Sequence, residues 1–364
     1  MRTHRTAWIV AAVIVVLLAG GTGVFLALRG DSGEPSGTAA PTLPAPSAEA
    51  PSASPPPPPG ADLTGPLDLL LIGVDTRVSI PDWQPHADAI MLLHIDEGLK
   101  TGFLYSLPRD LRVDIPAFAK NGYGGGRHKL TEAMSYGARV PGTDRADTAQ
   151  GYELLARTIE KYTGIRSFDA GAVLTFAGLS RLTDALGGVT LTIDQKVVSQ
   201  HRRPDGTART LRPGGGGYVG PQATYLPGTR KLTGWQAIDY ARQRYTAGGD
   251  YTRQRHQRQL VKALLTEAGK AGLATDPARL GSVVGALGDT LAVSGERTPV
   301  EYAYALRDLT PSGLTSVALP GSSVVSNGGY IGEQLDAGGR AFLRAVASGD
   351  PGAYLDKHPE LISK

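Results

Sequence analysis

The chain has 364 residues, of which 41% are hydrophobic and 20% are charged, so it carries enough apolar material for a sizeable folded core. Its formal net charge of +3 at pH 7 is too small to indicate nucleic-acid binding by itself. The absence of cysteine excludes disulfides, thiolate metal sites, thiol catalysis and a lipid-modified cysteine.

Residues 7–28 form an uncharged and largely apolar stretch that is long enough to cross a bilayer as one helix. Arg2 and Arg5 precede it, and the positive-inside rule keeps such an end in the cytoplasm. We therefore expect a cytoplasmic tail at 1–6, an uncleaved transmembrane signal-anchor at 7–28, and a membrane protein whose remaining chain lies outside the cytoplasm. The alternative is a cleaved signal peptide, whose apolar region is usually shorter.

A segment rich in proline, serine and alanine follows at 29–66. It has too few large apolar residues to form a core, so we expect a disordered linker that spaces the bilayer from the domain. A folded domain outside the cytoplasm is expected at 67–350, and a C-terminal tail at 351–364.

Continuous or alternating apolar runs predict strands, and apolar residues at helical spacing predict helices. Strands are expected at Leu67–Val74, Ala89–Ile95, Gly102–Leu107 and Val189–Ile193. Helices are expected at Gly151–Tyr162, Leu179–Leu186, Leu232–Arg242 and Tyr251–Ala268. This alternation indicates a layered α/β domain. A Gly/Pro-rich insertion at 200–227 is expected to be a mobile loop.

Polar side chains flank the first three expected strands. Asp75 and Arg77 follow the first strand, Asp88 directly precedes the second, and Arg109 and Asp110 follow the third. Functional groups of layered α/β domains gather just past the carboxyl ends of strands. Two carboxylates suit Mg²⁺, which prefers oxygen ligands and often completes its shell with phosphate oxygens. The alternative is that Asp75 is a turn residue and Asp88 a cap.

A second polar set is basic and lies in one short stretch. It contains Arg242, Arg244, Arg253, Arg255, His256 and Arg258. Arginine suits phosphate recognition because its planar guanidinium can donate several hydrogen bonds at once. The alternative is a solvated helix face, in which Asp239 and Asp250 pair with Arg242 and Arg253 at i,i+3 spacing. We favour a phosphate-rich ligand.

In chain order, these segments resemble the LytR-CpsA-Psr family of cell-wall glycopolymer ligases. The matching segments are LLLIGVDTR at 69–77, ADAIMLLHID at 87–96, YSLPRDLRVDIP at 105–116, HKLTEAMSYG at 128–137, LTDALGGVTLTI at 182–193, LTGWQAIDYARQR at 232–244 and DYTRQRHQRQ at 250–259. The resemblance implies an α/β/α domain with a central mixed sheet and an apolar tunnel for a lipid.

The resemblance also implies an activity. Family members transfer a glycan phosphate from a polyprenyl-pyrophosphate-linked precursor to a hydroxyl of peptidoglycan or another wall polymer, and release polyprenyl phosphate. By that likeness, Asp75 and Asp88 would hold Mg²⁺. Phosphate oxygens would be bound by Arg77, Arg109, Lys129, Arg242, Arg244, Arg253 and Gln257. Arg109 and Asp110 would be the catalytic pair, with Asp110 either a base for the acceptor or, as we favour, the residue that orients Arg109.

One departure from the family pattern concerns charge. Where His256 stands the family usually has arginine, so one charge of the basic motif is expected to depend on pH. Two other functions remain open: a pyrophosphatase that uses water as the acceptor, and a non-catalytic protein that binds wall polymer or lipid. These functions require different features: a binding protein requires the arginines but not the aspartate pair.

Overall fold

A computed structural model of the chain describes residues 57, 59–75, 84–214, 217–273, 276, 281–283, 287 and 290–363. Within these ranges, no helix combines the length and the apolar character needed to cross a bilayer. The expected anchor at 7–28, most of the expected linker, and Arg77 lie outside the described residues.

A mixed six-stranded sheet forms the centre of the molecule. Its strands lie in the order β13 (Leu291–Gly295), β6 (Ala170–Thr175), β1 (Leu67–Asp75), β2 (His86–Ile95), β3 (Gly102–Ser106) and β14 (Leu314–Val317). Strand β1 runs parallel to β6 and antiparallel to β2, and β14 runs parallel to β3. The four strands expected from the sequence are confirmed, with ends that differ by up to three residues.

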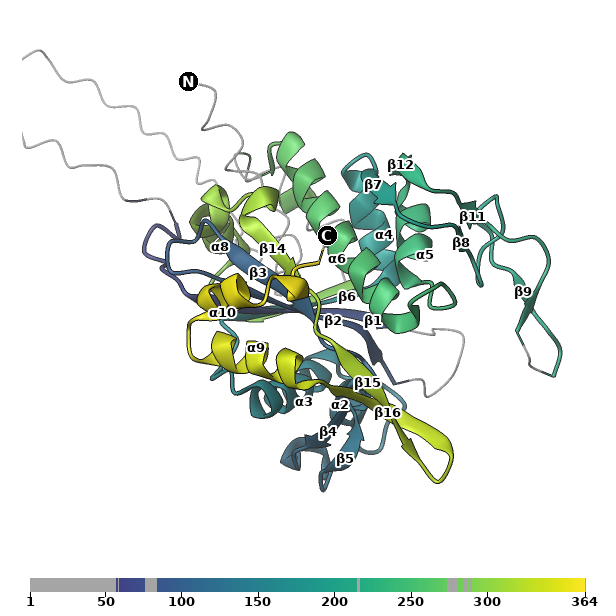
Figure 1. Ribbon diagram of the computed structural model, residues 1–364, viewed down its shortest axis with the longest axis horizontal. Helices are drawn as coiled ribbons and strands as arrows, with labels where there is room; N and C mark the ends of the chain where they lie inside the picture. Colours follow the sequence, from purple (N-terminus) through teal and green to yellow (C-terminus); the bar gives the residue numbers. More distant parts are fainter. Residues whose placement is uncertain are drawn as a thin grey trace, which may run out of the picture.

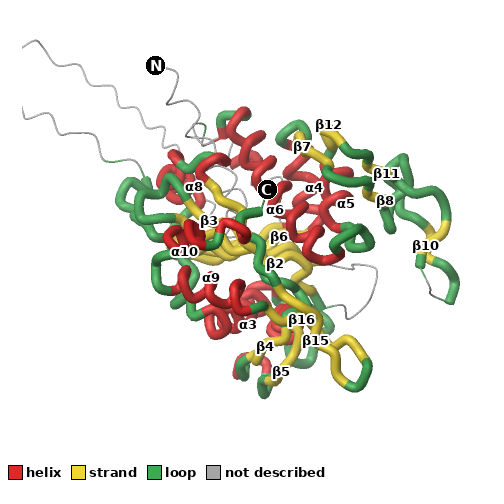
Figure 2. The backbone as a smooth tube through the Cα atoms, in the orientation of Figure 1, coloured by secondary structure: helices red, strands yellow, loops and turns green. Residues whose placement is uncertain are grey.

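Helices cover both faces of this sheet, as Figures 1 and 2 show. On one face lie α4 (Phe176–Ala185), α5 (Gly234–Arg242), α6 (Gly249–Lys270) and α8 (Pro299–Ala305), which contribute to the first hydrophobic core. On the other face lie α2 (Leu130–Ala138), α3 (Thr148–Thr163), α9 (Ala337–Ala347) and α10 (Pro351–Lys357), which contribute to the second. The domain is thus a three-layer α/β/α sandwich.

Capping residues set the ends of the helices. Asp147 accepts a hydrogen bond from the backbone N–H of Gln150 at the start of α3. Thr233 and Gln236 form a reciprocal capping box that starts α5. The expected helix from Leu232 therefore begins two residues later, because Leu232 ends strand β12 (Gly228–Leu232), which pairs with β7 (Val189–Ile193).

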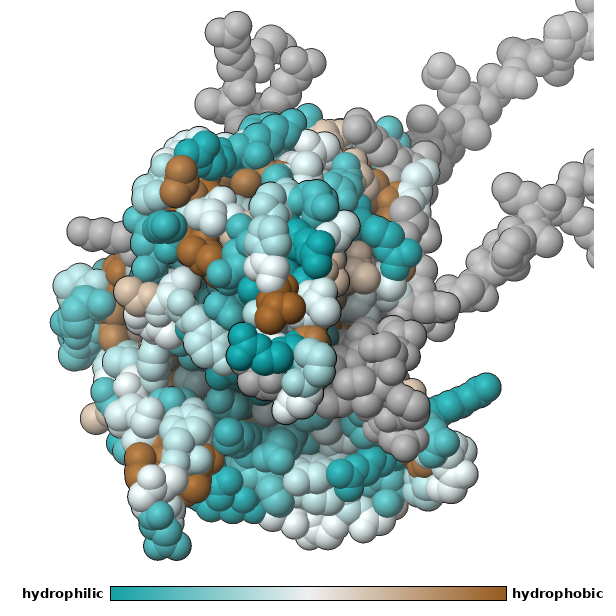
Figure 3. All heavy atoms as spheres, turned by 90° about the vertical axis from the view of Figure 1, so that its right-hand side faces the viewer, coloured by the Kyte–Doolittle hydropathy of each residue, from teal (hydrophilic) through white to brown (hydrophobic). Residues whose placement is uncertain are grey.

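Four further two-stranded ribbons decorate the sandwich. They are β4–β5 (Arg112–Ile115 and Gly126–Lys129), β8–β11 (Val197–Val198 and Thr224–Tyr225), β9–β10 (Thr210–Leu211 and Tyr218–Val219) and β15–β16 (Gly321–Ser326 and Gly329–Leu335). Short 3₁₀ turns occur at Ala119–Asn121, Leu306–Asp308, Pro311–Gly313 and Pro359–Leu361. Hydrophobic residues form separate spots on the mainly hydrophilic face in Figure 3.

The insertion at 200–227 is more ordered than the expected mobile loop. It contains the β9–β10 ribbon, and a buried arginine ties its two sides together. Arg209 donates hydrogen bonds to the carbonyl oxygens of Gln200, Tyr218 and Gly220. Because one guanidinium satisfies three carbonyl groups, the loop gains an internal framework that the Gly/Pro composition does not reveal.

Residues beyond both expected boundaries of the domain pack against it. At the start, Leu63 packs against the first core, and Asp62 lies 2.6 Å from Arg297, so the end of the expected linker belongs to the domain. At the other end, Leu355 and Leu361 are buried in the second core. The expected tail at 351–364 is therefore part of the folded unit as far as residue 363.

Candidate functional site

A β-bulge between β1 and β2 brings two carboxylates to one face of the sheet. Gly73 pairs with Ala89 and Val74 pairs with Ala87, which leaves Asp88 as the extra residue. Ala87 lies in the second core and Ala89 faces the first, so the bulge interrupts the alternation between them. Asp88 points away from the side of Ala87 and therefore falls on the same side as Ala89. Asp75 falls on this side too, because its neighbour Val74 faces the second core.

The loop after β3 joins these carboxylates to a set of cations. The guanidinium of Arg109 donates a hydrogen bond to Asp88. Its Nε lies 3.4 Å from Oδ1 of Asp110. Asp110 also lies 3.6 Å from the Lys129 ammonium and 3.6 Å from Nη2 of Arg244. Three cations thus converge on one carboxylate.

The charge state of Asp110 follows from this arrangement. Burial opposes ionisation, but the neighbouring Arg109, Lys129 and Arg244 outweigh it and hold the pKa of Asp110 below its ordinary value. A carboxylate with a lowered pKa is a weak proton acceptor. The geometry therefore favours the orienting role for Asp110 over the role of general base.

Buried Gln243 fixes the two arginines on either side of it. Its amide nitrogen donates to the backbone oxygen and the carboxylate of Asp239, at 2.7 and 2.9 Å. Its oxygen accepts from the backbone N–H of Gln200 at 3.0 Å. Since Gln243 points inward, Arg242 and Arg244 are directed to the other side of the extended chain at the end of α5.

Helix α6 adds a buried arginine to the site. Arg253, only 3% exposed, lies 2.8 Å from Asp250, which confirms the pairing expected at i,i+3 spacing. Asp250 also lies 3.5 Å from Nε of Arg244. Burial, together with the like charges of Arg244 and Arg109, lowers the pKa of Arg253. The other expected pair, Asp239 with Arg242, is not formed among the described residues. Asp239 accepts hydrogen bonds from Ser199, Tyr225 and Gln243 instead.

Half of the basic set points away from this site. His256 is fully buried, lies 3.0 Å from Asp194 and stacks on the ring of Tyr240. Arg255 pairs with the same Asp194, and Arg258 lies beside Ser106. Successive helical residues are 100° apart, so the four basic groups of α6 cannot share one face. His256 therefore lies outside the cluster that contains Arg109, Arg244 and Arg253.

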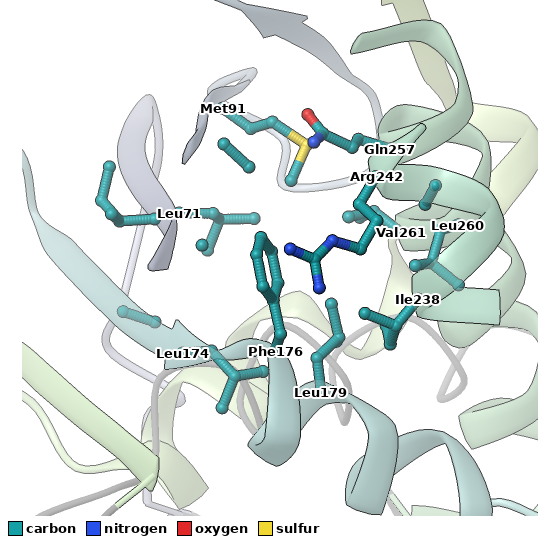
Figure 4. Close-up of a pocket in the computed structure, with 15 residues that line it drawn as sticks. Leu71, Met91, Leu174, Phe176, Leu179, Ile238, Arg242, Gln257, Leu260 and Val261 are labelled. Carbon is teal, nitrogen blue, oxygen red and sulfur yellow. The ribbon is translucent and has the colours of Figure 1, made fainter. Parts of the chain in front are cut away.

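An apolar pocket opens beside the cluster, between the sheet and helices α4, α5 and α6 (Figure 4). Its cavity volume is about 50 Å³, and about 610 Å³ when the open space at its mouth is counted. Its lining comprises Leu71, Ile72, Gly73, Ala89, Met91, Ala172, Leu174, Phe176, Leu179, Ile238, Ala241, Arg242, Gln257, Leu260 and Val261. Arg242 and Gln257 are the polar members of this lining, so one end of the pocket is marked by hydrogen-bond donors.

Arg242 connects the pocket with the charged cluster. Its guanidinium carbon lies 4.8 Å from the centre of the Phe176 ring, and its Nη2 lies 3.9 Å from the carboxylate of Asp75. Figure 4 shows this guanidinium beside Phe176, among the apolar side chains of the pocket. An amphipathic ligand could therefore place an apolar chain in the pocket and an anionic head among the cations.

The residues that could hold a metal are few. Across the described parts of the chain, no group of three or more His, Asp or Glu could hold a metal ion. Asp75 and Asp88 supply two carboxylates on one face, and Asp88 also accepts a hydrogen bond from Arg109. This donor set fits Mg²⁺ only if phosphate or water oxygens supply most of the shell, which is common for that ion.

Comparison with protein families matches residues 45–337 to the LytR_cpsA_psr family. The chain belongs to this family. Among curated relatives, biofilm regulatory protein A of Streptococcus mutans is 29% identical over 205 residues, which is 55% of this chain and 43% of that protein. The probable cell wall biosynthesis protein LcpB of Corynebacterium glutamicum is 29% identical over 230 residues, which is 59% of this chain and 45% of that protein.

A third relative of this LytR_cpsA_psr protein is the polyisoprenyl-teichoic acid–peptidoglycan teichoic acid transferase TagU of Enterococcus faecalis. It is 28% identical over 201 residues, which is 55% of this chain and 53% of TagU. The chain therefore spans about half the length of the curated relatives it matches. Their names include both regulators and cell-wall proteins.

Solved structures show the same fold. Protein gbs0355 from Streptococcus agalactiae superposes with a TM-score of 0.59 at 23% identity, covering 82% of this chain and 89% of that one. TagT bound to LI-WTA superposes with a TM-score of 0.53 at 22% identity, covering 80% and 89%. At these identities the likeness supports the LytR_cpsA_psr fold.

One residue of this family member's site has no local signal in the sequence. The hydroxyl of Tyr330, on the β15–β16 hairpin, donates to Asp110 at 3.3 Å and to Glu333 at 3.0 Å. The Lys129 ammonium lies 5.0 Å from the centre of the Tyr330 ring. Tyr330 is 220 positions from Asp110 in sequence, so only the fold shows that it belongs to the cluster.

Proposed function

We propose that this protein transfers a glycan phosphate from a polyprenyl-pyrophosphate-linked glycopolymer to a hydroxyl of peptidoglycan or another wall polymer. The observation that carries the proposal is the position of Arg242, which lines the apolar pocket and also faces Asp75 in the charged cluster. A polyprenyl chain suits the pocket, and a pyrophosphate suits the cations at its mouth. The names of TagU and of TagT bound to LI-WTA support this donor class.

The reaction requires positioning and charge neutralisation more than covalent chemistry. The acceptor oxygen attacks the glycan-linked phosphorus, the bond to the bridging oxygen breaks, and polyprenyl phosphate leaves. In this proposal, Arg109, Arg244 and Arg253 bind phosphate oxygens, while Asp110, which lies within ion-pair distance of Arg109 and Arg244, holds these two arginines in position. Bound Mg²⁺ would offset negative charge on the pyrophosphate, with Asp75 and Asp88 as its protein ligands.

Membrane attachment gives this proposal a spatial basis. An anchor at 7–28 keeps the domain outside the cytoplasm and in the same bilayer as a lipid-linked donor. Tethering raises the effective concentration of the two partners for each other. The linker after the anchor lets the domain reach an acceptor farther from the bilayer.

The test uses the purified full chain in detergent with a polyprenyl-pyrophosphate-linked glycan and peptidoglycan. We expect Asp75→Ala and Arg109→Ala each to lower the transfer rate by about 100-fold or more, because each removes charge stabilisation from the reacting phosphate. Arg344→Ala, an exposed position on α9, is the matched control and should keep full activity. Full transfer by both site variants would contradict the site assignment.

Product analysis separates the other functions. Free glycan phosphate without a wall adduct would identify a pyrophosphatase, since water would then be the acceptor. Ligand binding that a chelator leaves unchanged, without any turnover, would identify a binding protein. The transferase requires a wall adduct whose formation falls when Mg²⁺ is removed.

A further inference from the structure

A second basic groove lies on the opposite side of α6 from the charged cluster. Arg255, Arg258, Gln259 and Lys262 follow i, i+3, i+4 and i+7 spacing, so they form one stripe of the helix. The groove is lined by Thr190, Leu191, Thr192, Arg255, Arg258, Gln259, Lys262, Ala263, Thr266, Pro311, Ser316 and Ser363. It therefore combines three cations with the hydroxyl groups of neighbouring segments.

Arg258 is the unusual member of this groove. It is only 3% exposed, and within the described residues no carboxylate lies at ion-pair distance from it. Its Nη1 donates to Ser106 at 3.2 Å and its Nη2 lies 3.5 Å from the hydroxyl of Ser363. Among the residues that the structure describes, none accepts a hydrogen bond from its buried Nε. A buried cation whose partners are only neutral hydroxyls is costly, so an anion that approaches it gains a strong interaction.

The other cations of the groove differ in how far they are neutralised. Arg255 pairs with Asp194, which also contacts His256. Lys262 donates to the backbone oxygen of Leu314 at 2.9 Å. Burial lowers the pKa of Lys262, and burial with the like charge of Arg255 lowers the pKa of Arg258 to about 10. Arg258 therefore remains charged at neutral pH, and together Arg255 and Arg258 outnumber the single carboxylate of Asp194.

We propose that this groove binds a phosphate oxyanion, as a phosphate monoester or diester, between Arg258 and Lys262. A guanidinium, an ammonium and several hydroxyl donors match the multiple oxygens of phosphate better than the two oxygens of a carboxylate. The hydroxyl donors come from Thr190, Thr192, Ser316 and Ser363. This site has no aspartate pair and no apolar pocket, which distinguishes it from the first cluster.

The experiment records the side-chain Nε–H signal of Arg258 by ¹⁵N NMR in the full chain, assigned by its loss in Arg258→Lys. Inorganic phosphate, dimethyl phosphate and acetate are titrated separately. We expect phosphate or dimethyl phosphate to shift the signal to saturation, and acetate to have little effect. A response to dimethyl phosphate indicates a diester ligand, and a response to inorganic phosphate alone indicates a free phosphate or monoester.

Further variants make the test specific to the groove. Lys262→Gln should weaken binding by about tenfold, the effect of losing one charge-assisted hydrogen bond. Lys270→Gln, an exposed position on the same helix that pairs with Glu267, should leave binding unchanged. Asp75→Ala should also keep the response, so failure of the proposed transfer activity would not affect this result.

Two results would overturn the proposal. They are no shift with either phosphate compound, and a response to acetate equal to that to phosphate. If Arg258→Lys does not fold, the Lys262→Gln and Lys270→Gln comparison by calorimetry with inorganic phosphate still decides the matter: equal affinities in the two variants would contradict the site.

Discussion

His256 shows how one residue's burial sets a pH dependence of the fold. Burial lowers its pKa, although the hydrogen bond with Asp194 opposes this shift. The unfolded chain therefore binds a proton at this histidine at a higher pH than the folded chain does. Stability contributed by neutral His256 is present above the ordinary histidine pKa of about 6.5 and is lost as pH falls through the lower, folded value.

We expect His256→Gln to flatten the decline of stability as the pH falls below about 6.5. Glutamine can still donate a hydrogen bond to Asp194 but does not bind a proton in this range. Urea unfolding at several pH values measures the slope. Equal slopes for the two proteins would show that His256 titrates alike in the folded and unfolded chains.

Several individual site residues could be predicted from the sequence, and others could not. Asp75 and Arg109 flank apolar runs, and such positions lie at the ends of strands in a layered domain. The opposite directions of Arg253 and Arg255 follow from helical geometry, although the basic run alone suggests a single patch. Tyr330 could not be predicted, because its contact with Asp110 depends on how the whole chain folds.

Among the elements, the β15–β16 hairpin has the most direct effect on the site. The backbone N–H of Glu333 donates to the carbonyl oxygen of Asp110 at 2.8 Å. Strand β16 therefore lies directly against the loop that carries Arg109 and Asp110. Gly332 has a φ of +149°, and a Cβ there would lie 2.5 Å from that same carbonyl oxygen. Only glycine fits this approach without a backbone shift.

We expect Gly332→Ala to displace the hairpin and to lower transfer by about tenfold, as small displacements of positioning groups do. Gly329→Ala in the same hairpin is the matched control, because the nearest atom to its Cβ would be 3.6 Å away. Activity assays and thermal unfolding of both variants make the comparison. Equal activities would indicate that the hairpin does not position Asp110.

The limits of element prediction have physical causes. Leu232 continues a helical apolar pattern, but pairing of β12 with β7 fixes it in a strand. The register shift that leaves Asp88 unpaired depends on β1, a separate strand, so the sequence around Asp88 does not reveal it. The order within the 200–227 insertion depends on Arg209, whose acceptors lie up to eleven residues away.

At the scale of the whole molecule, the first core contains the pocket that we assign to a lipid. Ala172, on β6, lines this pocket and is nearly inaccessible to solvent. We expect Ala172→Phe to fill the space and to weaken binding of polyprenyl phosphate by about tenfold. The larger side chain should also cost about 1–3 kcal/mol of stability, as overpacking generally does.

Fluorescence titration with a labelled polyprenyl phosphate and thermal unfolding test this prediction. Ala347→Phe, an exposed position at the end of α9, is the control for adding the same side chain elsewhere. Unchanged lipid binding in a folded Ala172→Phe protein would place the lipid outside this pocket.

The C-terminal segment should contribute to the stability of the entire domain. Leu355 and Leu361 are buried in the second core, and the backbone N–H of Ser363 donates to the carbonyl oxygen of Ser316. We expect a chain that ends at residue 350 to lose at least about 2–5 kcal/mol of stability, because each buried leucine alone contributes on this scale. Calorimetry that finds an unchanged melting temperature would contradict this role.

The layered architecture is predictable because apolar runs and helical patterns alternate clearly between residues 67 and 270. The ends of the domain cannot be predicted in this way, since Leu63 and Leu361 are single apolar residues in polar surroundings. Such residues become part of a core only through contacts distant in sequence.

The path of the chain into the sheet has a mechanical consequence. Any tension that reaches the domain from its N-terminal side first meets residues 59–66, where the exposed Asp62–Arg297 pair offers little resistance. It then acts along β1, which is hydrogen-bonded to β2 on one side and to β6 on the other. A pull along a strand loads these bonds together in shear rather than one after another. The N-terminal contacts can therefore peel away under load while the strand that carries Asp75 stays in place.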